Sequence, residues 1–188
     1  MKKFAVLTND LQYAAANKHE ERKKSVEVFL PHETHFLNEM RKLGLPIIHL
    51  QLINPDNDPR AVGQPDELRF TRGSKGSQIL SEVLSDSDIV MEKPKDSGFF
   101  ETKLHEELQK MGIDTLIITG MQTQICIQTT AADAHFRNYG VYVPSDCCAS
   151  TRPEDTKRSL EWMADYCAKV MTSEEIIEVV KKELHEAK

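Results

Sequence analysis

Short apolar runs alternate with helical stretches along the whole chain, and this alternation limits the possible folds more than any other feature of the sequence. Each run is long enough for a buried strand and too short for a helix. Helical spacing is clearest in Ser25–Leu43, where Pro31 is expected to kink or split the helix. The predicted strands are 4–8, 46–50, 88–92, 115–119, 141–143 and 168–171. The predicted helices are 25–43, 77–84, 103–111, 124–138, 154–166 and one that begins at 173.

The order of these elements predicts how they are layered. A helix between two strands makes the strands parallel, and right-handed crossovers place helices on both faces of the sheet. The length of 188 residues suits one domain with one core. We therefore predict a single α/β domain over residues 1–188, a three-layer α/β/α sandwich with a mostly parallel six-stranded sheet.

Three reactive side chains follow the ends of predicted strands. Asp10 comes after the first strand, Lys93 after the third, and Cys126 after the turn that ends the fourth. Open parallel sheets bind ligands beyond the carboxyl ends of their strands. The sequence therefore predicts that these three residues, far apart along the chain, converge at one edge of the sheet.

Their chemistry suits nucleophilic catalysis. A cysteine is a poor nucleophile while protonated, and a helix N-terminus, where we place Cys126, stabilises its thiolate. A partly dehydrated Asp10 would have a raised proton affinity and act as the base, while Lys93 would oppose that shift and keep the pair ordered. Taken singly, each residue is better explained by packing, capping or a surface charge. The combination favours a catalytic triad of Asp10, Lys93 and Cys126.

The chain resembles the isochorismatase-like cysteine hydrolases, which include nicotinamidases and carbamoylsarcosine amidohydrolases. In this resemblance Asp10 corresponds to the catalytic aspartate and Cys126 to the nucleophile. The segment Lys93–Phe99 ends with a serine, a small residue and a phenylalanine, as the lysine segment of this family does. This ending aligns the family's lysine with Lys93 and not with Lys95. The resemblance covers nearly the whole chain and rests on Leu7–Gln12, Lys93–Phe99 and Gly120–Ala134.

The resemblance implies further features of the site. It implies a cis peptide bond between Met121 and Gln122 and an oxyanion hole formed by the backbone N–H groups of Gln122 and Cys126. It also implies a thioester intermediate, the release of ammonia or a small amine, and a homo-oligomer, either a dimer or a tetramer. The fold that it implies is the isochorismatase-like hydrolase fold.

The sequence departs from nicotinamidases at their metal site. Those enzymes carry a metal-binding Asp-x-His after the second strand, whereas here His49 has no aspartate two residues before it. We therefore predict no catalytic metal and no cofactor, and a metal-independent hydrolase of a small amide, with carbamoyl and ureido compounds as candidates. A vinyl-ether hydrolase, a metal-dependent nicotinamidase and a catalytically silent binding protein on the same fold remain as alternatives.

Substrate contacts are less defined in the sequence. By register, Gln12, Tyr13, Phe99 and Gln122 lie near the expected pocket, as substrate contacts or equally as packing residues. The segment Asn54–Lys75 has no regular pattern, and an irregular segment of this length inside a compact domain is usually functional or disordered. One arginine of this segment could bind a substrate carboxylate. It is equally possible that all of its arginines are ordinary solvated charges of a loop. These arginines are Arg60, Arg69 and Arg72.

Charge and composition restrict the partners. A formal net charge of −6 does not favour binding to nucleic acid, which needs a basic surface. No apolar run is long enough to span a membrane, and the apolar run after the N-terminus is too short for a signal peptide. The four cysteines fit no zinc ribbon and no redox pair. We therefore expect a cytoplasmic protein with reduced thiols and a small-molecule substrate.

Overall fold

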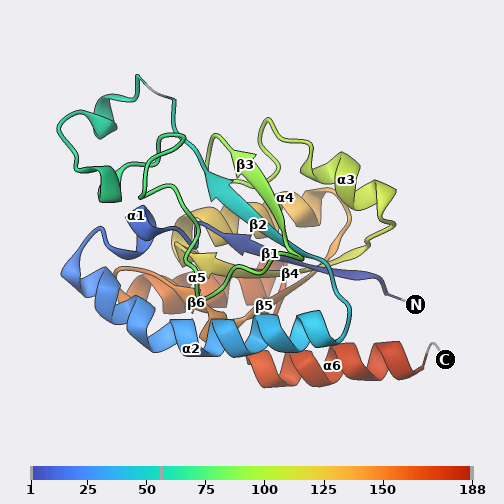
Figure 1. The fold of residues 1–188 in the computed structure, drawn as a ribbon. Coiled ribbons are helices and arrows are strands. Elements are labelled where there is room, and N and C mark those ends of the chain that lie inside the picture. The colour runs from blue at the N-terminus through green and yellow to red at the C-terminus, as the bar shows by residue number, and fades with distance from the viewer. Residues whose placement is uncertain (1, 56, 187–188) are drawn as a thin grey trace.

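The centre of the fold is a parallel sheet whose strands follow the order β3-β2-β1-β4-β5-β7 (Figure 1). The computed structural model describes residues 2–55 and 57–186. All six predicted strands are present, and a two-residue strand, β6, pairs with β4 as a seventh that the sequence did not predict. The strands are β1 Phe4–Asn9, β2 Ile47–Leu52, β3 Ile89–Lys93, β4 Thr115–Met121, β5 Gly140–Pro144, β6 Cys148–Ala149 and β7 Lys169–Met171.

Helices cover both faces of this sheet. One face packs against α2 and α6, which lie side by side, and the other packs against α3, α4 and α5 (Figure 1). This confirms the predicted three-layer α/β/α arrangement. The α-helices are α1 Tyr13–Ala16, α2 Glu20–Lys42, α3 Leu104–Lys110, α4 Gln128–Phe136, α5 Pro153–Tyr166 and α6 Ser173–His185. The other helical turns are η1 Pro59–Ala61, η2 Asp66–Leu68, η3 Thr123–Ile127, which is π-helical, and η4 Ser145–Cys147.

Strand β1 shows why its sequence forms a central strand. All of its residues are buried, and successive side chains point to opposite faces. Phe4 and Val6 belong to the core beneath α2 and α6, whereas Ala5 and Leu7 belong to the core beneath α3 to α5. A strand covered on both faces favours apolar residues on both, and this explains the apolar run over Phe4–Leu7 that begins β1.

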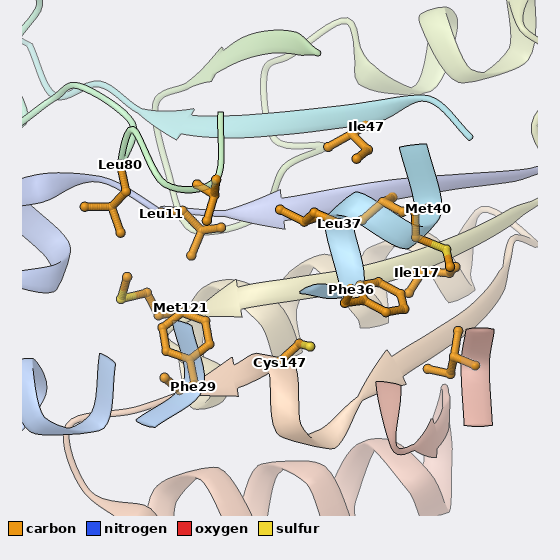
Figure 2. Packing of buried hydrophobic residues seen from close by; sticks show 14 of the residues in the cluster. Leu11, Phe29, Phe36, Leu37, Met40, Ile47, Leu80, Ile117, Met121 and Cys147 are labelled. Atoms are coloured by element: carbon orange, nitrogen blue, oxygen red, sulfur yellow. The ribbon is translucent and has the colours of Figure 1, made fainter. Parts of the chain in front are cut away.

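The core between α2 and the sheet fixes the position of that helix. Phe36, Leu37 and Met40 recur at helical spacing and face Ile47 of β2 and Ile117 of β4 (Figure 2). All five side chains are nearly or fully inaccessible to solvent. Each such side chain contributes about 1.5–3 kcal/mol of burial free energy, so α2 is held firmly against β1, β2 and β4.

We expected Pro31 to kink or split this helix, but α2 is one continuous helix of 23 residues that includes Pro31. Pro31 lies on the exposed face, so the loss of its N–H leaves the packed face undisturbed. The helix also begins five residues earlier than predicted.

Among residues 2–55 and 57–186, no helix combines the length and the apolar character needed to cross a membrane.

The predicted helix at 77–84 is wrong. This segment forms turns, and its backbone pairs with the chain that follows β1. Ile79 forms a β-bridge with Gln12, and the Leu80 N–H donates to the Leu11 carbonyl over 2.8 Å. These hydrogen bonds to a distant segment replace the bonds that a helix would form within itself. Ile79, Leu80 and Val83 have the spacing of a helix, but they pack into the core from an irregular segment.

Candidate active site

The carboxyl ends of β1, β3 and β4 meet at one edge of the sheet. Asn9 at the end of β1 lies opposite Gly120 of β4, and Leu52 at the end of β2 lies opposite Lys93 at the end of β3. Strand β1 has β2 on one side and β4 on the other, so the chain connections diverge there. Such a divergence opens a crevice beyond the strand ends, and Asp10 lies at its base.

Asp10 and Lys93 form a buried ion pair. Lys93 Nζ lies 2.9 Å from Asp10 Oδ1, and the two side chains are 0% and 6% exposed. The ammonium group also donates to the carbonyls of Lys95 and Asp96 over 3.1 and 3.0 Å. Burial raises the pKa of Asp10, and the positive charge of Lys93 opposes this. Burial lowers the pKa of Lys93, but the nearby negative charges, led by Asp10, outweigh it and leave that pKa raised.

Cys126 lies in the π-helical turn η3 at the entrance to α4, with its side chain buried beside this ion pair. Its thiol donates to Asp96 Oδ1 over 3.8 Å. Burial and the Asp10 charge raise the pKa of Cys126 well above its usual value, while Lys93 opposes them. The sequence led us to expect a thiolate stabilised by a helix N-terminus. The raised pKa instead makes Cys126 a neutral thiol that lies beside a carboxylate.

The turn after β4 depends on a glycine. Gly120 has a φ of +109°, and a Cβ built on it would lie 2.3 Å from the carbonyl oxygen of Asn9 and 2.7 Å from its nitrogen. Both contacts are with the backbone of β1, which cannot move away without disturbing Asp10. The peptide bond between Met121 and Gln122, next along the chain, is cis, at the position where the resemblance places one.

We expect Gly120→Ala to lower the free energy of unfolding by about 3 kcal/mol, because it adds backbone strain to a steric clash inside the sheet. Gly44→Ala is the matched control, since Gly44 also has a positive φ, +80°, but a Cβ there would meet nothing within 4 Å. This control should cost only about 1 kcal/mol. Urea unfolding measures both, and equal losses would contradict the role of the Asn9 contact.

Asn9 connects the segments that carry the three candidate residues. Its side chain accepts a hydrogen bond from Thr130 Oγ1 on α4 at 3.2 Å and donates to the Thr119 carbonyl of β4 at 3.5 Å. The same Thr130 Oγ1 accepts from the backbone N–H of Gly98, in the loop after Lys93. Asn9 therefore links the ends of β1 and β4 with the lysine loop, a role that the sequence alone did not reveal.

A cavity of about 550 Å³ opens beside these residues. Asp10, Asp96, Gln122 and Cys126 lie in its wall, and the irregular segment after β2 contributes much of the opposite side. Lys93 is covered beneath Asp10, so it reaches the cavity only through its ion-pair partner. Five basic side chains also line the cavity: Lys18, His19, Arg22, Arg60 and Arg69.

Of the four residues proposed as substrate contacts, only Gln122 lines this cavity. The Gln12 side chain is fully buried and acts as a bridge between backbone segments. Its amide donates to the carbonyls of Leu52 and Ser77, and its oxygen accepts from the Leu52 N–H over 2.8 Å. Gln12 therefore fixes the segments that border the cavity without contacting its contents.

Tyr13 and Phe99 are also packing residues. The hydroxyl group of Tyr13 lies 3.2 Å from Ser81 Oγ, and the ring packs on the core beneath α2. Phe99 is buried on the opposite face, where it stacks on Tyr139 with ring centroids 6.0 Å apart and Arg137 lies over its ring. The position of each residue shortly after a predicted strand located it near the correct edge of the sheet. That position did not determine which way its side chain points.

His49 is held in a hydrogen-bonded environment that does not suit a metal ligand. Thr8 Oγ1 lies 2.7 Å from one ring nitrogen, and Asp88 Oδ2 lies 3.1 Å from the other. Asp88 also pairs with Arg41. Within residues 2–55 and 57–186, no group of three histidine, cysteine, aspartate or glutamate side chains is placed to hold a metal ion. The surroundings of His49 in β2 therefore do not fit a nicotinamidase-type metal ligand.

Comparisons with known proteins agree with this geometry. A family model described as the isochorismatase domain matches residues 4–175. The uncharacterized isochorismatase family protein YaaI of Bacillus subtilis is 32% identical over 160 residues, which cover 82% of this chain and 85% of that protein. The structure also resembles N-carbamoylsarcosine amidase from Thermoplasma acidophilum, with a TM-score of 0.75, 29% identity, and coverage of 91% of this chain and 96% of that one.

A second relative matches over part of the chain. Ureidoacrylate amidohydrolase RutB of an Enterobacter species is 36% identical over 97 residues, which cover 50% of this chain and 42% of that protein. The names of this relative and of the Thermoplasma enzyme describe hydrolysis of a C–N bond in a small molecule.

Proposed function

The chain belongs to the isochorismatase family, and from that premise we propose that it is a cysteine-dependent hydrolase of a small-molecule amide. The observation that carries this proposal is the buried Cys126 thiol beside the Asp10–Lys93 ion pair in the wall of one cavity. The amidohydrolases among its relatives support a carbamoyl or ureido compound as the substrate.

In the first proposed step, Asp10 removes the proton from Cys126 as Sγ attacks the substrate carbonyl. The raised pKa of the thiol means that it is neutral before substrate binds, so proton transfer and attack are coupled. The oxyanion accepts hydrogen bonds from the backbone N–H groups of Gln122 and Cys126. Asp10 then returns the proton to the leaving nitrogen, the C–N bond breaks, and a thioester remains on Cys126.

In the second step, Asp10 removes a proton from a water molecule that attacks the thioester carbonyl. The C–S bond breaks, the proton returns to the sulfur, and the acid product leaves. Lys93 holds one Asp10 oxygen at 2.9 Å, and its positive charge opposes the rise in pKa that burial causes at Asp10, which favours the ionised base. No metal or redox group takes part in the proposed sequence.

Direct detection of the thioester tests this proposal. The enzyme is incubated with a panel of carbamoyl, ureido and simple primary amides, quenched in acid and analysed by mass spectrometry. We expect ammonia or amine release together with an acyl group on the peptide that contains Cys126. Release of pyruvate from isochorismate that persists in Cys126→Ala would instead support a vinyl-ether hydrolase. A folded enzyme without turnover or adduct over the whole panel would support a binding protein.

A further inference from the structure

Arg22 is a half-buried guanidinium in the wall of the catalytic cavity, in the first turn of α2. Its Nε and Nη2 donate to Thr151 Oγ1 over 3.0 and 2.7 Å, and its Nη1 donates to the Ala15 carbonyl over 3.3 Å. A guanidinium has five N–H donors, so two remain. Among residues 2–55 and 57–186, no carboxylate lies within ion-pair distance of it. Arg22 is therefore positioned by neutral groups and keeps its charge and two donors available.

The other two arginines of the cavity differ from Arg22. Arg60 pairs with Asp58 at 2.8 Å, and Arg69 pairs with Asp66 at 2.7 Å. Their charges are thus balanced within the loop after β2. These were two of the three arginines that the sequence offered as carboxylate ligands, and the structure shows each of them already paired with an acid. The third, Arg72, pairs with Glu92 and does not line the cavity.

The electrostatic surroundings of Arg22 place it near the reacting atoms. Burial lowers the pKa of Arg22, and the negative charge of Asp10 opposes this shift. A half-buried cation without a carboxylate partner is costly unless an anion comes to it. An anion that enters the cavity would supply the close ion-pair partner that Arg22 lacks.

Gln122 provides a second, independent observation on the same wall. Its side-chain oxygen accepts from the Thr151 N–H at 3.3 Å, but its Nε2 is inaccessible to solvent and has no hydrogen-bond partner among the described residues. A buried donor left without an acceptor costs about 1–3 kcal/mol. Arg22 and Gln122 are both bonded to Thr151, and both line the cavity, so the two side chains are neighbours in its wall.

We propose that Arg22 and the side-chain amide of Gln122 form a carboxylate-binding subsite, and that the substrate is an amide with a carboxylate at its other end, such as a carbamoyl or ureido acid. A carboxylate has two oxygens that match the two remaining guanidinium donors. Lys18, which also lines the cavity, adds attraction for an anion. The subsite rests on the proposed function, since Cys126 would act at the end of the substrate that lies away from Arg22.

Charge-selective alkylation of Cys126 tests the subsite without requiring turnover. Iodoacetate and 3-iodopropionate carry a carboxylate, and their amides are neutral reagents of nearly the same shape. Peptide mass spectrometry measures the rate at Cys126 for each reagent. We expect Arg22→Gln to lower the acid-to-amide rate ratio by about tenfold to a hundredfold, the usual worth of a charge-assisted hydrogen bond. Arg22→Lys should retain part of the preference, because it keeps the charge.

Arg72→Gln is the matched control, because it removes an arginine of the same region that lies outside the cavity. It should leave the rate ratio unchanged. A purely structural role of Arg22 would change the rates of acid and amide reagents equally, and an unchanged ratio in Arg22→Gln would overturn the proposal.

An equilibrium measurement separates the subsite from the proposed nucleophile. In Cys126→Ala, calorimetry compares binding of 3-ureidopropionate with that of its neutral amide, before and after Arg22→Gln is added. Tighter binding of the acid that is lost with Arg22 supports the subsite even if Cys126 proves unreactive toward every reagent. Equal binding of acid and amide to Cys126→Ala would overturn the subsite, whereas the proposed nucleophile would still stand on the thioester experiment.

Discussion

Asp10→Asn is expected to reduce amide hydrolysis by about 10²–10⁴-fold and also to lower the free energy of unfolding by about 3–5 kcal/mol. The loss of activity follows from the loss of the base that accepts the Cys126 proton. The loss of stability follows because Lys93 is 0% exposed and Asp10 is its one ion-pair partner among residues 2–55 and 57–186. The variant leaves a buried ammonium group without a counter-charge.

A double variant separates these two effects. Asp10→Asn/Lys93→Met removes both charges and leaves an apolar side chain of similar length, so it should recover much of the stability that Asp10→Asn loses. It should not recover activity, because the base is still absent. Cys126→Ala is the complementary control, since it removes the nucleophile and retains the ion pair.

Urea unfolding and ammonia release measure the two quantities on all variants. A double variant that is less stable than Asp10→Asn would show that the cost comes from packing and not from the unpaired charge. Asp10→Asn with activity close to that of the wild type would exclude Asp10 as the base, whatever its stability.

The sequence predicted the convergence of Asp10, Lys93 and Cys126 because the relevant signals are local. Each residue follows a short apolar run, and alternation with helices makes those strands parallel. Parallel strands place their carboxyl ends on one edge, so position after a strand is enough to locate a residue near the crevice. This rule needs no knowledge of side-chain direction.

Side-chain direction and long-range contacts account for what the sequence did not predict. Gln12, Tyr13 and Phe99 lie at the correct edge, but their side chains turn into backbone bridges or the core. Arg22 escaped notice because its environment is formed with Thr151, 129 positions away along the chain. No local period or motif encodes such a contact, and charged residues at the start of a helix are usually solvated.

The same limit applies to Glu33, a charged residue in the middle of α2 that is completely buried. Thr119 Oγ1 of β4 donates to its Oε1 over 2.6 Å, and its Oε2 has no hydrogen-bond partner among the described residues. Burial raises the pKa of Glu33 to about 8, against the opposing hydrogen bonds from Thr119 and Cys147. Glu33 is therefore mostly protonated at neutral pH.

This raised pKa predicts a loss of stability as the pH rises. The unfolded chain has the ordinary glutamate pKa of 4.5, so below that pH both states hold the proton and the stability is fully present. Between 4.5 and about 8 the unfolded chain releases the proton and the folded protein retains it. Stability therefore falls through this window, by about 5 kcal/mol in total at about 1.4 kcal/mol per pH unit, and levels off above it.

Glu33→Gln should remove this dependence, because the amide keeps the oxygen that accepts from Thr119 and has no proton to lose. Wild type and variant should have similar free energies of unfolding near pH 5, and the variant should be more stable by several kcal/mol near pH 8 to 9, where ~5 kcal/mol is the upper bound. Denaturant unfolding at a series of pH values measures this difference. Glu27→Gln, an exposed position on the same helix, should leave the pH dependence unchanged.

The difference between Glu33→Gln and the wild type is more informative than either pH curve alone. His49, whose pKa is lowered by burial, destabilises the fold in the opposite direction, as the pH falls below 6.5. The buried thiols Cys126 and Cys148 have pKa values well above 9, so they retain their protons in the folded state throughout this window. Subtraction cancels all of these groups, and two parallel curves would show that Glu33 is ionised in the folded protein.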